Sequence, residues 1–183
     1  NSAQVTVDEP VSINAEPQNL IECIGGTASL LVNASGGAGF TYQWQSASAP
    51  AGPFSNVGNN QNSFAPSSTM PGTTYFRVHL ASVNGICEDT SVVTVATIVP
   101  DQSTTTQPQG ASLCPGEPVQ LFAAATGGVA PLQYQWQSAT TSGGPWTNVS
   151  GAISPTFTPP TGNSGTTFYQ MTASSTGDGC SDA

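Results

Sequence analysis

The chain has 183 residues, a length that fits two β-sandwich domains of about 100 residues each better than one. Ten acidic residues against one arginine and no lysine give a net charge of −9, which excludes nucleic acid and anionic membrane surfaces as partners. Only 6% of the residues are charged, so amides and hydroxyls must hydrate the surface. No apolar run is long enough to insert into a bilayer, and we expect any secretion signal or anchor outside this segment.

One block of sequence occurs twice. Residues 42–47 read YQWQSA, and residues 134–139 read the same. Gly-Pro-aromatic and Gly-Thr-Thr-aromatic-aromatic motifs follow each block in the same order. The offset between equivalent residues is 91 for the first cysteines, 92 for the tryptophans and 93 for the last cysteines. A nearly constant offset predicts two copies of one domain.

Each copy consists of short apolar runs separated by Gly, Pro, Asn and Ser, which is typical of strands and turns. We predict an all-β protein of two tandem immunoglobulin-like β-sandwich domains at residues 9–99 and 100–183, with a linker at 97–109. Strands are expected at 28–32, 40–45 and 75–80, with a last strand through 92–95. The two-residue alternation of a strand turns four aromatic side chains inward as core anchors, namely Tyr42, Trp44, Tyr134 and Trp136.

The two ends of the chain are out of phase with the repeat. Gln4, Val5, Thr6 and Val7 match Val92–Val95, the expected last strand of the first copy, whereas the second copy stops at Ala183 before such a strand. We predict that residues 1–8 form an inter-repeat strand belonging to a preceding domain, and that the second domain lacks its final strand. A long covalent array and a polymer joined by strand addition both remain open.

The repeat resembles a known family. A cysteine before the second strand, Tyr-x-Trp, Gly-Pro-aromatic and a later second cysteine resemble the immunoglobulin-like repeats of large secreted adhesins and gliding-type filament proteins of Bacteroidetes-like bacteria. Its best carriers are Cys23-Ile24-Gly25-Gly26, Cys114-Pro115-Gly116-Glu117 and the two YQWQSA blocks. The resemblance implies a secreted protein at the cell surface.

The four cysteines fall as one pair in each copy. In an acidic, turn-rich chain this predicts two disulfides, Cys23–Cys87 and Cys114–Cys180, and an oxidising compartment.

Residues for catalysis or metal binding are sparse. The only histidine, His79, is expected to face outward, and the second copy has Thr172 in its place, so we predict that the chain is not an enzyme and needs no cofactor. Calcium is a weak alternative, since Glu88, Asp89 and Asp101 would have to converge from separate turns.

Two aromatic side chains remain as candidates for a ligand. Phe54 and Trp146 occupy equivalent Gly-Pro-aromatic turns, where they either face a carbohydrate or cover the edge of the sandwich. The leading hypothesis is a structural repeat of an extracellular filament or adhesin stalk, with neighbouring copies or adjacent repeats as partners. The alternatives are an adhesin module that binds surface glycans and an accessory domain of a secreted hydrolase.

Overall fold

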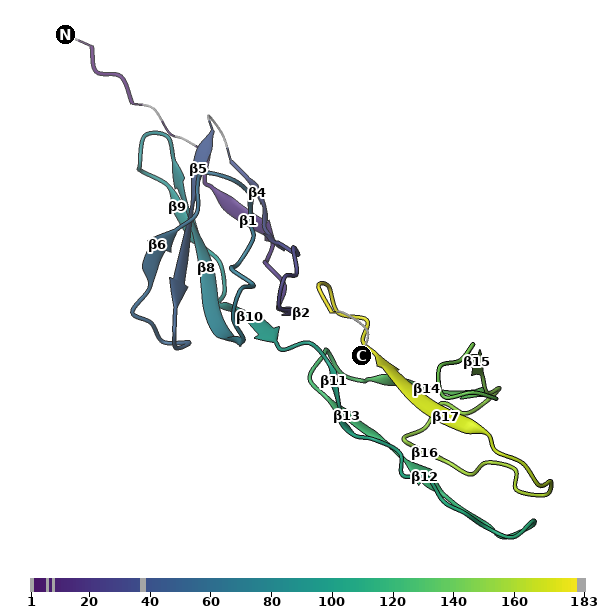
Figure 1. Cartoon of the computed structure of the whole chain (residues 1–183). Coiled ribbons are helices and arrows are strands. Elements are labelled where there is room, and N and C mark those ends of the chain that lie inside the picture. Colours follow the sequence, from purple (N-terminus) through teal and green to yellow (C-terminus); the bar gives the residue numbers. More distant parts are fainter. Residues whose placement is uncertain (1, 6, 8, 37–38, 181–183) are drawn as a thin grey trace. The chain divides into compact units, whose positions relative to one another are not determined.

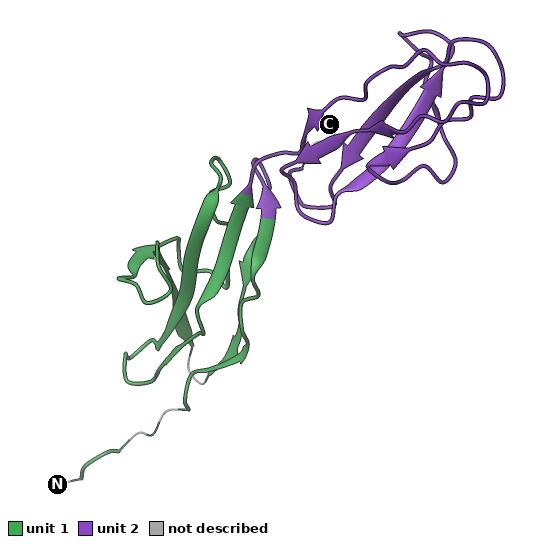
Figure 2. Cartoon of the chain, turned by 90° about the horizontal axis from the view of Figure 1, so that it is seen from below, with its two compact units in different colours: residues 1–21, 27–98 green, residues 22–26, 99–183 purple. Residues whose placement is uncertain are grey.

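The computed structural model describes residues 2–5, 7, 9–36 and 39–180, and these residues form strands and no helix (Figure 1). The all-β prediction is confirmed. Within the described residues, no helix is long and apolar enough to pass through a membrane. The chain divides into two compact units, residues 1–21 with 27–98 and residues 22–26 with 99–183 (Figure 2). The prediction places residues 22–26 in the first domain, because they belong to the first sequence copy. In the structure they belong to the second unit.

The first unit is a two-layer sandwich. One layer is a sheet in the order β2-β10-β8-β5-β6, with β9 also paired to β8; the β1–β4 and β3–β7 pairs form the remainder. The strands are β1 (Ser12–Ala15), β2 (Leu20–Cys23), β3 (Leu30–Leu31), β4 (Asn33–Ser35), β5 (Phe40–Ala47), β6 (Ser55–Val57), β7 (Ser63–Phe64), β8 (Gly72–Ser82), β9 (Glu88–Thr90) and β10 (Thr94–Val99).

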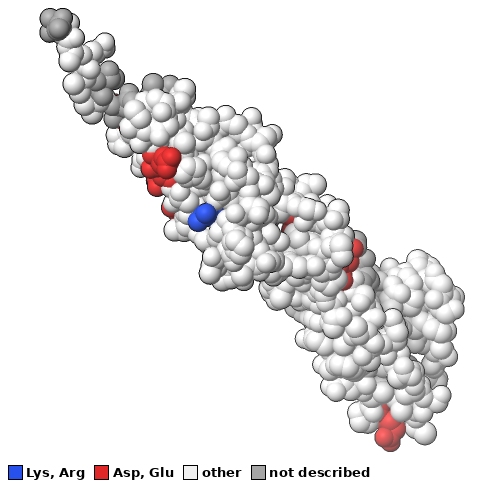
Figure 3. Space-filling view, turned by 90° about the vertical axis from the view of Figure 1, so that its left-hand side faces the viewer, with Lys and Arg blue, Asp and Glu red and all other residues white. Residues whose placement is uncertain are grey.

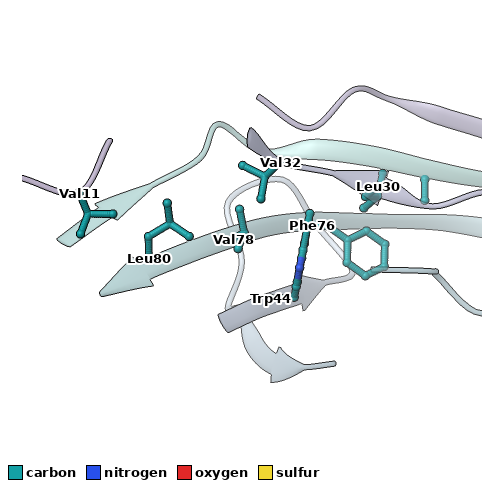
Figure 4. Close-up of a cluster of buried hydrophobic side chains, with 8 residues drawn as sticks. Val11, Leu30, Val32, Trp44, Phe76, Val78 and Leu80 are labelled. Atoms are coloured by element: carbon teal, nitrogen blue, oxygen red, sulfur yellow. The ribbon is translucent and has the colours of Figure 1, made fainter. Parts of the chain in front are cut away.

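The core of the first unit follows the two-residue alternation of its strands. Phe76, Val78 and Leu80 on β8 are buried on one face, and Trp44 on β5 is completely buried beside them (Figure 4). The Trp44 indole N–H donates to the Gln61 carbonyl at 3.0 Å, so its one polar atom is satisfied inside the core. Tyr42, the second predicted anchor, is half-buried against the same cluster.

The second unit repeats this plan with fewer strands. Its sheet has the order β15-β14-β17, and the other pairs are β11–β13 and β12–β16. The strands are β11 (Ser103–Thr106), β12 (Leu121–Phe122), β13 (Ala124–Thr126), β14 (Gln133–Ala139), β15 (Thr147–Asn148), β16 (Thr156–Phe157) and β17 (Phe168–Ser174).

The core of the second unit centres on Trp136, which is completely buried and donates its indole N–H to the Ser154 carbonyl at 2.8 Å. Met171 and Ala173 on β17 are buried around it, and Phe157 lies 5.7 Å from the Trp136 ring. Tyr134 is half-buried at the margin.

The glutamines of the YQWQSA blocks explain why this motif is repeated. Gln43 donates to the carbonyls of Trp44 and Val57 at 2.9 and 3.0 Å, and Gln135 makes the equivalent bonds to Trp136 and Val149. In each copy the side-chain amide therefore ties the central strand to the segment that follows it.

Two expected segments differ in the structure. Of residues 28–32, only Leu30 and Leu31 form a strand, β3, which pairs with β7. The next strand, β4, begins after Val32 and pairs with β1. Most of the predicted linker at 97–109 is strand, since β10 continues to Val99 and β11 begins at Ser103. The burial of alternate residues along β10 shows why it extends so far.

Candidate functional site: an open strand slot

In the first unit, β10 fills the space between β2 and β8. It pairs antiparallel with the first half of β8, from Thr94 opposite Phe76 to Ile98 opposite Gly72. Thr94, Ala96 and Ile98 are buried along it, so this strand both completes the sheet and closes one side of the core.

In the second unit, the residues equivalent to those flanking β10 border an open cavity instead. Residues 111–114 correspond to β2 and residues 165–169 to the β8 residues that pair with β10. All of them line one cavity of about 880 Å³. No strand runs between these segments in the part of the second unit that the structure describes. We call residues 111–114 and 165–169, with the cavity between them, the strand slot.

The strand slot has the properties of a site for an added strand. β17 pairs with β14 on one side, and no strand partner occupies its other side within the described residues. An unpaired strand edge presents backbone N–H and C=O groups in the spacing that another strand satisfies. Leu121, Phe168 and Tyr169 add apolar surface to the lining.

The N-terminal segment matches the missing strand in a register different from the predicted one. Strand β11 starts 91 residues after β1, the same offset as the first cysteines. Continued backwards, this offset aligns Ala3, Val5 and Val7 with the buried face of β10, Thr94, Ala96 and Ile98. This register differs by three residues from the predicted match of Gln4–Val7 to Val92–Val95, which follows the VTV sequence shared by residues 5–7 and 93–95.

The side chains of this segment are open to solvent. Val5 is 86% exposed and Val7 is 89% exposed, and Gln4 is exposed as well. Thr6, the remaining predicted residue, lies outside the described residues. The two exposed valines lie at alternate positions and form one apolar face. The equivalent face of β10 is buried in the first unit.

The predicted disulfide pairing is wrong. Cys23 bonds to Cys180, 157 residues away in sequence, with 4.9 Å between the Cα atoms. Cys87 is a half-buried free thiol and Cys114 an exposed one. The single disulfide thus links the first cysteine of copy one to the second cysteine of copy two.

The length of β8 explains why Cys23 and Cys87 cannot meet. The Ile24 N–H donates to the Val99 carbonyl at 3.1 Å, which places the Cys23 turn at the end of β10, next to the start of β8 at Gly72. Cys87 follows the other end of β8, where its carbonyl accepts from the Ser82 N–H at 2.8 Å. The two cysteines therefore lie at opposite ends of an 11-residue strand.

Residues 22–26 fold into the second unit around the disulfide. The Cys23 N–H donates to the Asp178 carbonyl at 2.8 Å, and Glu22, Cys23 and Gly26 are buried. A Cβ atom on Gly179 would lie 2.3 Å from the Gly26 nitrogen, so only glycine allows this close approach.

The predicted calcium candidates are separated. Asp89 accepts hydrogen bonds from the Ile13 and Thr90 N–H groups at 2.9 and 2.8 Å, and Glu88 lies 3.9 Å from the His79 ring. Asp101 belongs to the other compact unit. Across the described residues, no group of three or more His, Cys, Asp or Glu side chains is placed to hold a metal.

The aromatic candidates are half-buried at the edge of each sandwich. The Arg77 guanidinium carbon lies 4.3 Å from the centre of the Phe54 ring, a cation–π contact, while the Arg77 Nε–H donates to Gln45. In the second copy Gln170 replaces Arg77 and donates to Gln137. The face shown in Figure 3 is almost entirely uncharged, in line with the 6% of charged residues in the sequence.

The model of one domain family matches the sequence twice, at residues 14–100 and 103–183, and its description is a domain of unknown function, DUF8696. The chain belongs to this family. The two DUF8696 matches coincide with the two sequence copies. A search of curated proteins finds no match to the chain.

Solved structures of tandem immunoglobulin domains resemble the DUF8696 pair. Titin domains I67–I69, in an E-to-A variant, match at a TM-score of 0.62 and 11% identity, over 96% of this chain and 63% of that one. Sidekick-1 immunoglobulin domains 1–4 match at 0.53 and 15%, over 96% and 48%. Rst D1-D2 matches at 0.53 and 13%, over 95% and 96%. Identities this low show the fold alone, and the chain spans less than two thirds of the titin fragment.

Proposed function

We propose that the DUF8696 pair is a structural repeat of an extracellular filament or stalk in which each unit is completed by a strand that leads into the next unit. The observation that carries this proposal is the strand slot of the second unit, which is lined by the equivalents of the residues that hold β10 in the first. In this role the chain is a building element without enzymatic activity.

The occupant we propose for the slot is residues 3–7 of a second copy of the chain. In the first unit β10 ends at Val99 and β11 begins at Ser103, so a completing strand passes into the following repeat within a few residues. Residues 3–7 precede β1, at Ser12, at an equivalent distance. The strand that completes one unit thereby connects it directly to the next.

Insertion would bury apolar side chains and pair backbone groups. Burying Val5 and Val7 contributes roughly 1.5–3 kcal/mol each. Hydrogen bonds to the 165–169 edge add to this, since strand addition satisfies backbone groups on both chains. The register that aligns Val5 with Ala96 turns Gln4 and Thr6 away from the core.

An extracellular location is supported by two features. The Cys23–Cys180 bond requires an oxidising compartment in most cells. The surface relies on hydroxyl and amide groups, with 6% charged residues in the sequence, so salt affects its solubility little.

Sedimentation velocity over a range of concentrations tests the proposed joint. We expect the chain to form assemblies, and the Val5→Asp/Val7→Asp variant to remain monomeric because both charges would enter the core. The matched control Gln4→Asp/Thr6→Asp adds the same charge on the opposite face and should still assemble. A wild-type chain that stays monomeric throughout, or two variants that behave alike, would contradict strand completion.

The role in the cell is tested with antibodies on unpermeabilised source cells. We expect surface labelling, and in a reducing denaturing gel either an 18.5 kDa chain or a much longer one. The shorter mass identifies a strand-exchange polymer and the longer one a covalent array, in which the following residues supply the same strand. Labelling only after permeabilisation would rule out a surface filament.

A further inference from the structure

The disulfide follows a rule that the two copies can repeat. The first cysteine of one copy bonds to the second cysteine of the next copy, as Cys23 does with Cys180. By the sequence offsets, Cys114 is the equivalent of Cys23, and Cys87 is the equivalent of Cys180. Both equivalents are free thiols. The chain therefore carries one closed joint and the two halves of another.

The turn at Cys114 already has the conformation of the bonded turn at Cys23. The Gly26 N–H donates to the Cys23 carbonyl at 3.0 Å, and the Glu117 N–H donates to the Cys114 carbonyl at 3.1 Å. The third residue of each turn is a glycine with positive φ, 85° at Gly25 and 89° at Gly116. Only glycine adopts this backbone readily, so both turns present the cysteine in the same way.

The two turns differ in what covers them. Cys23 and the adjacent Glu22 are buried against the segment that carries Cys180. Cys114 is exposed, and the adjacent Leu113 is 45% exposed. Cys114 also lines the strand slot, just as Cys23 ends the strand beside β10. If a strand of another copy filled the slot, the unit that follows this strand would therefore begin close to the Cys114 thiol.

The other half of the joint is the loop that joins β8 to β9. The Cys87 N–H donates to the Ser82 hydroxyl at 3.0 Å, which fixes the thiol at the end of the hairpin. Ile86, beside it, is 75% exposed, and Val83 is 74% exposed. The loop thus presents a cysteine within exposed apolar surface.

The residues beside the cysteines differ between the closed joint and the open halves. The closed joint has Glu22 before Cys23 and Gly179 before Cys180, whereas the open halves have Leu113 before Cys114 and Ile86 before Cys87. Gly179 approaches Gly26 closely in the closed joint, and the equivalents of these two glycines are Ile86 and Glu117, so the second joint must hold its two turns further apart than the first.

We propose that Cys114 of one copy forms a disulfide with Cys87 of the copy whose residues 3–7 fill its strand slot. The proposal rests on the strand completion proposed above. The observation that supports a bond at these thiols is the disulfide already formed between their equivalents.

The oxidant is a low-molecular-weight disulfide such as glutathione disulfide. The Cys114 thiolate attacks it and forms a mixed disulfide, releasing one glutathione thiolate. The Cys87 thiolate of the neighbour then attacks the Cys114 sulfur and releases the second. Two protein thiols are oxidised and one glutathione disulfide is reduced to two glutathione molecules, which take up the two protons.

Assembly in a glutathione redox buffer, followed by alkylation, a non-reducing gel and mass spectrometry of the peptides, tests the proposal. We expect a covalent ladder and a Cys114–Cys87 peptide, with Cys114–Cys114 and Cys87–Cys87 peptides at least tenfold rarer. Cys87→Ser and Cys114→Ser should each abolish the ladder in the gel. In sedimentation Cys87→Ser should still assemble, because Cys87 lies outside the strand slot and the added strand is unchanged.

The results separate the two proposals. The disulfide proposal would be overturned if the protein assembles in sedimentation but both thiols are still free and become alkylated. It would also be overturned if the three cysteine pairings occur at random frequencies. Either result would leave strand completion intact. Absence of any assembly would overturn both.

Discussion

The two units of this DUF8696 chain carry the same repeat, yet within the described residues one sheet is completed by β10 and the other has an open side. In the first unit β10 lies between β2 and β8, and its Ala96 joins the core. In the second unit the equivalent segments border a cavity of about 880 Å³. The turn at residues 22–26 belongs to the first sequence copy but to the second structural unit. The structural units therefore differ from the sequence copies at residues 22–26.

The largest expected effect concerns the disulfide. Cys180→Ser removes the constraint on a 157-residue separation, and chain entropy assigns this about 5 kcal/mol of the free energy of unfolding. Cys87→Ser is the matched control, since this cysteine forms no disulfide in the single chain. It should change the free energy of unfolding by less than about 0.5 kcal/mol. Urea unfolding without reductant measures both. Equal effects of the two changes would contradict the pairing.

The central tryptophans test whether the units unfold separately. Trp44→Ala and Trp136→Ala each remove a completely buried indole, at a cost of about 3–5 kcal/mol. Hydrogen exchange read by mass spectrometry should show lost protection in β5 and β8 for the first variant, and in β14 and β17 for the second. Uniform loss across both units in either variant would show that they form one cooperative unit.

A synthetic peptide of residues 1–10 should close the open unit. Added to a chain lacking residues 1–9, at about 100 times its Kd, it should stabilise the second unit by about 2.7 kcal/mol through mass action. The first unit should be unaffected, because β10 already occupies the equivalent place. A peptide with aspartate in place of Val5 and Val7 is the control. Stabilisation of both units by the peptide, or of neither unit, would argue against binding of residues 3–7 in the strand slot.

The smallest effect is expected at the only basic residue. Gln170 takes the place of Arg77 in the second copy and makes the same type of bond to a glutamine on the central strand. Arg77→Gln should therefore change stability by less than about 1 kcal/mol, mainly through the lost contact with Phe54. Urea midpoints at low and high salt measure this change. A loss of several kcal/mol would mean that the two copies use this position differently.

Much of the fold follows from local patterns in the sequence. The repeat period is visible in the residues themselves, and the alternation along 75–80 predicts which side chains of β8 face the core, because side chains of a strand alternate regardless of its partners. The break between β3, which pairs with β7, and β4, which pairs with β1, depends on distant partners and leaves no such trace in the sequence.

The site was predictable only in part. Aligning the two copies shows that the described part of the second unit contains no counterpart of β10, but the register of an added strand does not follow from the short VTV match. The disulfide pairing could not be predicted from the sequence, because it depends on Cys23 and Cys87 lying at opposite ends of β8. Spacing alone leaves three connectivities for four cysteines. The close packing of Gly179 could not be predicted, since glycine is common in the turns of this chain.

Hydrogen exchange at the two equivalent strand edges tests the central claim most directly. The amides of residues 72–76 are paired with β10 and should exchange slowly in every state of the protein. Those of residues 165–169 should exchange rapidly in the monomeric Val5→Asp/Val7→Asp variant and become protected in the wild-type assembly. Equal protection of 165–169 in monomer and assembly would contradict the strand slot.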